Sequence, residues 1–431
     1  MHQQKFEIAL LDIIGNAPPK VALAISGGAD SVALLYLATQ WAKNAQVKLV
    51  IFHVNHNLRK SSVEDAKFVE EITRSLNHNF YLFHWKEAAS ITSAAQEKAR
   101  QARYDMMTIK CQELGIKLLM TAHHFDDVVE NYLMRKKRGS GVFGLSYSNS
   151  YFVNDIHIVR PLLLFRKKSL LQYLNDNKYA WVEDETNISD KYERNRIRKQ
   201  FNLFSDSKKQ LVYDEIDQIQ QEAKILNQDL IKFLAEFVHI DQMGFCVLQV
   251  KDYKNLLYDL QIQVLSYLFT IVSGKMTLPR FRNIAPIIEK IQHNTLVNCS
   301  LHGCLLIDIN NNQLLICRER DQIAIEEYQL QRNLIWDNRF EINTKITHND
   351  YKVTTVSHKD YLSIKDKLSL SFIKQKLKIP NKLILFTLPV IKNLEKIVAI
   401  PHISYYDEKI LEGNLQIIFR PNFISRFTHF L

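Results

Sequence analysis

The hydrophobic pattern of the first 200 residues alternates between short apolar runs and longer segments with helical spacing. Short apolar runs are typical of buried strands, and apolar residues at three- and four-residue intervals indicate amphipathic helices. This alternation predicts an α/β domain with a doubly wound, mainly parallel sheet, whose ligand binds at the carboxyl ends of the strands. We expect strands at 20–25, 47–54, 80–85 and 117–121, and helices at 30–41, 62–76, 92–114 and 126–137.

The pattern changes after about residue 205. A long polar segment with helical spacing is followed by stretches that mix helical and strand-like patterns. We therefore predict a first domain over 1–205, a helical linker over 206–238, and two smaller mixed α/β domains over 239–325 and 335–431.

Charge and cysteine content narrow the classes of function. The chain of 431 residues has a net charge of +10, and residues 1–205 hold 28 basic and 21 acidic residues. This excess favours an anionic partner such as nucleic acid or a nucleotide. The five cysteines include no CxxC pair, which argues against a disulfide scaffold or a zinc ribbon. No uninterrupted apolar segment is long enough to predict a membrane span, so we expect a cytoplasmic protein.

The strongest candidate for chemistry is a glycine-rich turn between the first strand and the helix after it. The glycines allow a tight turn, and the helix N-terminus adds partial positive charge, so backbone amides could cradle a phosphate. A carboxylate repels phosphate unless a cation lies between them, so Asp30 predicts Mg²⁺ bound by its side chain and by phosphate oxygens. The alternative is a plain strand-to-helix turn. The predicted ATP-binding residues are Ser26, Gly27, Gly28, Ala29, Asp30 and Ser31.

A second glycine pattern, GxGxxG over 139–144, follows a basic helix rather than a strand, so it fails the context of a dinucleotide fingerprint. The chain has no GxxxxGK followed by Ser or Thr, which excludes the ATPase and kinase P-loop. We interpret 139–144 as a mobile loop beside a basic run that contacts the RNA backbone, the alternative being a solvated helix end. The predicted RNA contacts are Arg135, Lys136, Lys137, Arg138, Gly139, Ser140 and Gly141.

The turn at 26–31 resembles the PP-loop of the N-type ATP pyrophosphatases, which cleave ATP between the α- and β-phosphates. Within that group, further motifs resemble those of the tRNA(Ile)-lysidine synthetases, although Asn131 replaces the usual threonine. The resemblance covers residues 20–200 and is weaker beyond 205. The motifs lie at His53–Arg59, Glu97–Tyr104, Thr121–Asn131, Lys137–Ser146, Arg160–Leu163 and Trp181–Arg198.

The resemblance implies a two-step ligation with ATP and Mg²⁺. ATP adenylates the carbon-2 oxygen of the wobble cytidine in an isoleucine tRNA with a CAU anticodon, and pyrophosphate leaves. The side-chain amine of free L-lysine then attacks that carbon, AMP leaves, and the product is lysidine. It further implies that 239–325 and 335–431 take part in tRNA recognition. Whether the chain acts as a homodimer is left open.

In that reaction, we expect Arg103 and Arg194 to stabilise charge at the α-phosphate, with Arg100 and Arg198 behind them. Helical spacing places Asp127 and Glu130 on one face, together with His123. We expect these two carboxylates to bind the lysine ammonium, one of them later accepting its proton. The predicted catalytic residues are Asp30, Arg103, Asp127, Glu130 and Arg194.

Other interpretations remain open at this point. His123 and His124 with Asp126 and Asp127 could form a metal cluster, and Asp126 is a further candidate for placing Mg²⁺. A PP-loop tRNA thiolase would need catalytic cysteines, which the absence of a CxxC pair disfavours. A non-catalytic RNA-binding protein with ATP as a structural ligand is the third alternative.

Overall fold

The computed structural model describes residues 1–55, 62–84, 93–183, 193–275, 277–309, 312–324, 326–346, 350–367 and 381–421. The chain forms two compact units, Met1–Lys224 and Ile225–Leu431, which are described separately. Among the described residues, no helix is both long and apolar enough to cross a membrane.

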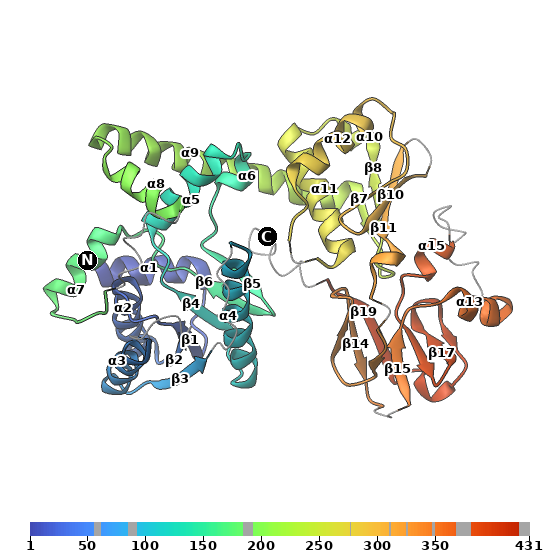
Figure 1. The fold of residues 1–431 in the computed structure, drawn as a ribbon, viewed down its shortest axis with the longest axis horizontal. Coiled ribbons are helices and arrows are strands. Elements are labelled where there is room, and N and C mark those ends of the chain that lie inside the picture. Colours follow the sequence, from blue (N-terminus) through green and yellow to red (C-terminus); the bar gives the residue numbers. More distant parts are fainter. Residues whose placement is uncertain are drawn as a thin grey trace. The chain divides into compact units, whose positions relative to one another are not determined.

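The first unit is built on a six-stranded sheet with the strand order β3-β2-β1-β4-β6-β5 (Figure 1). All neighbouring strands run parallel except β5, which pairs antiparallel with β6 at the sheet edge. The predicted mainly parallel sheet is therefore confirmed. The strands are β1 (Lys20–Ala24), β2 (Lys48–Asn55), β3 (Asn79–His84), β4 (Leu118–Thr121), β5 (Ser150–Val153) and β6 (Ile156–Val159).

Helices cover both faces of this sheet, as a doubly wound fold requires. Successive side chains of a strand point to opposite faces. Val21 and Leu23 of β1 join one core with α1, α2 and α7, whereas Ala22 joins a second core with α4. Figure 1 shows α4 on the side of the sheet opposite α2 and α3. These helices are α1 (His2–Ile14), α2 (Ala29–Ala45), α3 (Ser62–Ser75), α4 (Ser93–Glu113) and α7 (Lys167–Asp176).

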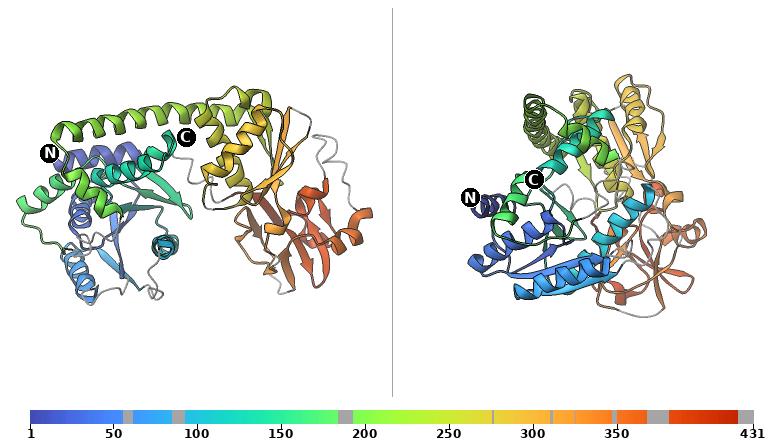
Figure 2. Two further views of the ribbon diagram at one scale, coloured as in Figure 1. Left: turned by 45° about the horizontal axis from the view of Figure 1, so that its top comes forward. Right: turned by 60° about the vertical axis from the view of Figure 1, so that its left-hand side comes forward.

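A third core positions the helix that follows β4. Val128 and Tyr132 of α5 pack with Phe201 of α8 and with Val212 and other residues of α9. This packing holds α5 beside α8. The long helix α9 begins at the predicted linker and contains the boundary between the two units (Figure 2). The helices are α5 (Phe125–Lys137), α6 (Val142–Leu145), α8 (Glu193–Asn202) and α9 (Asp206–Phe237).

The second unit begins with an antiparallel sheet of order β7-β8-β11-β10-β9, accompanied by three helices. The strands are β7 (Val238–Ile240), β8 (Cys246–Gln249), β9 (Cys299–Leu301), β10 (Cys304–Asp308) and β11 (Gln313–Arg318), and the helices are α10 (Val250–Lys254), α11 (Tyr258–Ser273) and α12 (Phe281–Gln292).

Two further sheets complete this unit, with orders β12-β15-β16-β17-β18 and β13-β14-β19. Val247 and Leu315 of the preceding sheet share one core with Trp336, Phe340 and Ile391, so the two predicted later domains pack on common apolar side chains. The elements are β12 (Tyr328–Gln329), β13 (Leu334–Trp336), β14 (Phe340–Thr344), β15 (Tyr351–Thr354), β16 (Val390–Asn393), β17 (Lys396–Ile400), β18 (Tyr405–Tyr406), β19 (Leu415–Phe419), α13 (His358–Ile364) and α15 (Asn381–Leu385).

Candidate active site

The parallel pairing of β1 with β4 brings two motifs together. Ala24, the last residue of β1, lies opposite Thr121, the last residue of β4. The turn over 26–31 and the segment that leads into α5 therefore leave the sheet side by side. This edge, at the carboxyl ends of the strands, is where doubly wound folds bind ligands.

The hydroxyl of Ser31 organises the glycine-rich turn. Its Oγ accepts the backbone N–H of Ser26 at 3.2 Å and of Gly27 at 3.1 Å, and it donates to the carbonyl oxygen of Gly28 at 2.8 Å. Ser31 is one of the predicted ATP-binding residues, but its hydroxyl hydrogen is directed to the turn itself. The amides of the first turn of α2 have no carbonyl partner within the helix, so they supply the donors for an anion.

Gly27 is required by both conformation and space. Its φ is +94°, and a Cβ there would lie 3.2 Å from Cγ2 of Val69. Its carbonyl oxygen also accepts the backbone N–H of Val182 at 2.9 Å, which ties a second predicted motif to the turn. A side chain at this position would disturb the turn at the point where phosphate is expected to bind.

Asp30 in the first turn of α2 faces a buried histidine. Its Oδ2 lies 3.3 Å from Nε2 of His124 and 3.8 Å from Nζ of Lys167, whereas its Oδ1 is buried without a hydrogen-bond partner. Nδ1 of His124 lies 3.6 Å from an oxygen of Asp126 and of Asp127. Burial lowers the pKa of His124, but the hydrogen bond to Asp30 and the three carboxylate charges outweigh it and raise this pKa above its usual value.

The predicted alternative of a metal cluster is not supported by these positions. Among the described residues, no group of three or more His, Cys, Asp or Glu side chains is arranged to hold a metal ion. Oδ2 of Asp126 instead accepts the backbone N–H of Lys167 at 2.7 Å, at the start of α7. The free Oδ1 of Asp30 fits a Mg²⁺ ion that takes most of its ligands from phosphate and water.

Asp127 and Glu130 lie on the face of α5 beside α8, and two arginines of α8 bind them. Nη2 of Arg194 donates to Oδ1 of Asp127 at 2.6 Å, and its Nε donates to Oε2 of Glu130 at 2.5 Å. Nε of Arg198 donates to Oε1 of Glu130 at 2.5 Å. Four predicted residues thus meet in one network. The sequence did not reveal that the expected lysine ligands and the expected phosphate ligands would pair with each other.

The electrostatics of this network favour the ionised form of Asp127. Burial raises the pKa of Asp127, but the charges of His124, Arg194 and His123 lower this pKa by a larger amount, so the net shift is downward. Oδ2 of Asp127 also accepts the backbone N–H of His124 at 2.9 Å, which caps α5. Asp127 is therefore suited to holding a cation throughout the physiological pH range.

Arg103 occupies a different environment. It lies on α4, with its guanidinium carbon 5.5 Å from the ring centroid of Tyr104. Within the described ranges, no ion pair joins it to the carboxylates of α2 or α5. The side chain of Arg100 and parts of the motifs at His53–Arg59 and Trp181–Arg198 lie outside the described residues.

The predicted RNA contacts lie at the end of α5 and just after it, and all of them except Ser140 are exposed. Arg135 donates to the carbonyl oxygen of Gly144 at 2.6 Å, Lys136 pairs with Glu215 at 2.6 Å, and Arg138 pairs with Glu193 at 2.5 Å. The expected loop over 139–144 is in part the helix α6, which begins at Val142. A Cβ at Gly144 would lie 2.9 Å from Cβ of Ser140, so glycine permits this compact turn.

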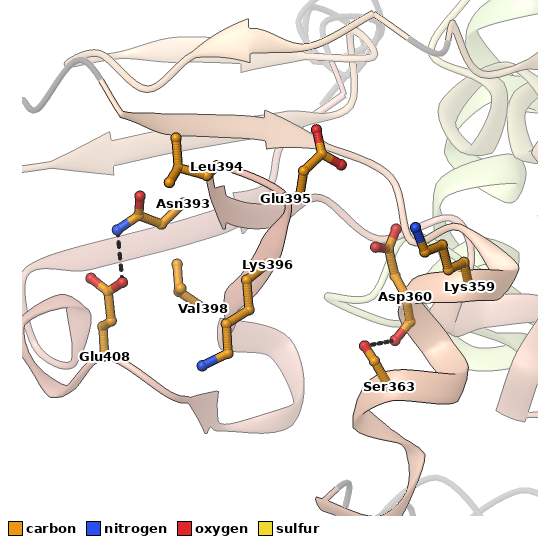
Figure 3. Close-up of a pocket in the computed structure, with 9 residues that line it drawn as sticks. All are labelled: Lys359, Asp360, Ser363, Asn393, Leu394, Glu395, Lys396, Val398 and Glu408. Atoms are coloured by element: carbon orange, nitrogen blue, oxygen red, sulfur yellow. Dashed lines mark hydrogen bonds between the residues drawn. The ribbon is translucent and has the colours of Figure 1, made fainter.

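One surface pocket of about 600 Å³ lies in the second unit and contains none of the predicted site residues (Figure 3). Several polar and charged groups in or beside this pocket have internal partners. Asn393 donates to Glu408 at 2.9 Å, Lys392 pairs with Asp360 at 2.9 Å, and Lys396 pairs with Asp407 at 2.6 Å. The pocket does not contribute to the site described above.

Comparison with known proteins assigns the chain to a family. A PP-loop domain model matches residues 2–203. The tRNA(Ile)-lysidine synthases of Rickettsia typhi and Rickettsia akari are each 40% identical, over 435 and 439 residues, and both alignments cover all of this chain and all of the relative.

A solved structure is also similar in part. The U34-tRNA thiolase NcsA of Methanococcus maripaludis matches 51% of this chain and 76% of its own, with 15% identity and a TM-score of 0.44. That similarity is too low to bear on function. On the full-length identity to the curated relatives, the chain is a PP-loop enzyme that belongs to the tRNA(Ile)-lysidine synthase family, the carbon–nitrogen ligases that form lysidine in tRNA.

Proposed function

We propose that this chain joins free L-lysine to carbon 2 of the wobble cytidine in an isoleucine tRNA with a CAU anticodon. The observation that carries the proposal is the convergence of Asp30, His124 and Asp127 at the ends of β1 and β4. This convergence joins a phosphate-binding turn to a pair of carboxylates suited to an ammonium group. Relatives that match the chain over its whole length are named tRNA(Ile)-lysidine synthases, which supports this proposal.

The first step transfers AMP to the tRNA. The carbon-2 oxygen of the cytidine attacks the α-phosphorus of ATP, the bond to the β-phosphate oxygen breaks, and pyrophosphate leaves. The amides at the start of α2 bind the leaving group. Asp30 would hold Mg²⁺ through its unpartnered oxygen, and the ion would neutralise charge on the phosphates. Arg194 and Arg103 are the proposed cations at the α-phosphate.

The second step forms the carbon–nitrogen bond. The lysine amine attacks carbon 2, the bond from that carbon to the oxygen breaks, and AMP leaves with the oxygen. The ammonium must first lose a proton, which costs roughly 4–5 kcal/mol at pH 7 because its pKa is about 10.4. Asp127 and Glu130 are the proposed ligands of the ammonium, and one of them accepts that proton.

The proposal also assigns tRNA binding. The exposed basic residues 135–138 and the glycine turn after them are the proposed contacts to the anticodon arm. Elongator methionine tRNA has the same anticodon, so residues 239–325 and 335–431 are proposed to recognise other parts of the tRNA.

Sulfur transfer is the less favoured alternative. A thiolase needs a reactive thiolate, and burial raises the pKa of Cys111 and of Cys317 to about 12. Burial also raises the pKa of Cys246, Cys299 and Cys304. None of the five thiols has the low pKa of a catalytic cysteine.

The test uses the full chain, Mg²⁺, ATP, radiolabelled lysine and an unmodified CAU-anticodon transcript of isoleucine tRNA. We expect the label to enter RNA with one AMP and one pyrophosphate per lysine. Asp30→Ala should abolish incorporation while leaving tRNA binding nearly unchanged, and a methionine elongator transcript should accept little label. Formation of ADP, or labelling that requires a sulfur donor, would contradict the proposal.

A further inference from the structure

The two carboxylates proposed to bind lysine have no free oxygen in this structure. Arg194 holds one oxygen of Asp127 and one of Glu130, Arg198 holds the second oxygen of Glu130, and the backbone N–H of His124 holds the second oxygen of Asp127. Because the side chains of Asp127 and Glu130 are only 17% and 4% exposed, an incoming ammonium can reach these oxygens only if one of these donors moves. The lysine site is therefore filled by the chain itself.

Arg194 is the donor that can leave. Its side chain is 38% exposed, whereas the side chain of Glu130, which it binds, is 4% exposed. The amide of His124 is fixed in the cap of α5, and Arg198 occupies only Glu130. Departure of Arg194 would free one oxygen of Asp127 and one of Glu130 together. A lysine ammonium, with three donors and one positive charge, can replace the guanidinium there without changing the net charge.

A nucleotide supplies a competing anion for this guanidinium. His124 separates Asp30 from Asp127, with its two ring nitrogens 3.3 Å and 3.6 Å from their respective oxygens. Phosphates bound at the turn beside Asp30 would therefore be separated from the carboxylates that hold Arg194 by about the width of one imidazole ring. Guanidinium groups form strong paired hydrogen bonds with phosphate.

We propose that Arg194 occupies the lysine-ammonium site of the nucleotide-free enzyme and moves to the phosphates when ATP binds, so that nucleotide binding opens the lysine site. This inference rests on the proposed function, because it takes Asp127 and Glu130 as the lysine ligands. It adds an order of binding, with ATP before lysine. The enzyme would then not hold lysine at a site that has no nucleotide to activate the tRNA.

The coupling is measured directly as lysine affinity. Radiolabelled lysine is titrated against the full chain by equilibrium dialysis, with and without Mg²⁺ and an ATP analogue that has a methylene bridge between the α- and β-phosphates. We expect lysine to bind at least about 10-fold more tightly with the analogue. Because binding linkage is reciprocal, saturating lysine should tighten binding of the analogue by the same factor.

Variants identify the residue responsible. Arg194→Gln should bind lysine without nucleotide at least about 10-fold more tightly than the unchanged chain, and the analogue should add little. Arg194→Lys should show intermediate coupling, because a single ammonium cannot donate along both edges as a guanidinium does. Arg196→Gln changes an exposed arginine of the same helix and should keep the full coupling. Circular dichroism confirms that each variant is folded.

Two results would overturn the inference. One is equal lysine affinity with and without the analogue. The other is lysine binding that appears only when tRNA is present, because nucleotide would then not be the signal that opens the site. The proposed function would fail differently, through a lack of labelled lysine in the RNA product under turnover conditions.

Discussion

Two arginine–carboxylate networks in this protein use the same chemistry in opposite surroundings. In the first unit, Arg194 and Arg198 bind Asp127 and Glu130, and their side chains are 38% and 29% exposed. In the second unit, Arg318 and Arg339 share the carboxylate of Asp337, and the two arginines are 5% and 0% exposed. The difference in burial separates a network that can exchange partners from one that cannot.

The partners of the buried network reinforce this difference. Arg318 also donates to the carbonyl oxygens of Gly303 and Gln322, and Arg339 donates to that of Thr387. Backbone carbonyls of three separate segments are thus tied to one ion cluster. The exposed network has side-chain carboxylates as its main acceptors. We infer that the buried cluster stabilises the fold, whereas the exposed one is available to ligands.

The largest effect on stability is expected from Asp337→Asn. The change leaves two buried guanidinium groups without a counter-charge, which should lower the free energy of unfolding by about 3–5 kcal/mol. Urea denaturation of the full chain measures this change. The control is Glu341→Gln, which removes an ion pair whose arginine, Arg420, is 56% exposed, and it should cost less than about 1 kcal/mol. Equal losses of unfolding free energy in the two variants would contradict the difference between buried and exposed ion pairs.

The free energy of unfolding should also depend on pH, because the second unit buries a histidine. Both ring nitrogens of His402 are buried, its ring lies 5.2 Å from that of Phe340, and burial lowers its pKa to about 4. Between pH 6.5 and pH 4 the unfolded chain binds a proton that the folded chain does not, so stability falls as pH falls. The expected loss is about 3 kcal/mol, measured by urea denaturation across this range. His402→Gln should lack this part of the pH dependence, and an identical profile would contradict the assignment.

The exposed network should affect activity more than stability. In Glu130→Gln, one of the two carboxylate oxygens that accept from Arg194 and Arg198 becomes an NH₂ group. That NH₂ group would then face a guanidinium donor instead of accepting from it. We expect kcat/KM for lysine incorporation to fall about 30-fold, or about 2 kcal/mol, with a smaller change in unfolding free energy. A variant that loses stability but keeps its activity would place Glu130 with the structural residues.

The smallest effect concerns the basic residues at the end of α5. Lys136 already pairs with Glu215, whereas no ion pair of Lys137 is found in the described part of the chain. Lys137→Gln should therefore weaken tRNA binding about three- to fivefold at moderate salt. The number of phosphate charges neutralised by the protein, read from the slope of affinity against salt concentration, should fall by close to one. Lys136→Gln should have less effect in the same filter-binding titration. A larger loss of tRNA affinity in Lys136→Gln than in Lys137→Gln would contradict the assignment of Lys137 as an RNA contact.

The parts of this structure that are local in sequence could be predicted well. The turn over 26–31 follows from a strand, two glycines and a helix that are contiguous, and the alternation of strands and helices predicted the mainly parallel sheet. The antiparallel hairpin of β5 and β6 was not predicted, because two four-residue strands give little periodic signal.

The hydrophobic pattern of the sequence could not predict contacts between distant segments. Helical spacing predicted that Asp127 and Glu130 share a face, but the arrival of Arg194 depends on how α8 packs against α5. The cluster of Arg318, Asp337 and Arg339 likewise depends on tertiary packing. The inward hydrogen bond of Ser31 is a local detail that residue type alone does not specify.

The central claim is that a pyrophosphate leaving group is bound by the turn between β1 and α2. The most direct test is to follow the terminal phosphate of γ-labelled ATP while the chain modifies a CAU-anticodon transcript in the presence of lysine. The account predicts that all of the label released by the reaction appears as pyrophosphate, in amounts equal to the AMP formed. Label released as orthophosphate together with ADP would contradict it.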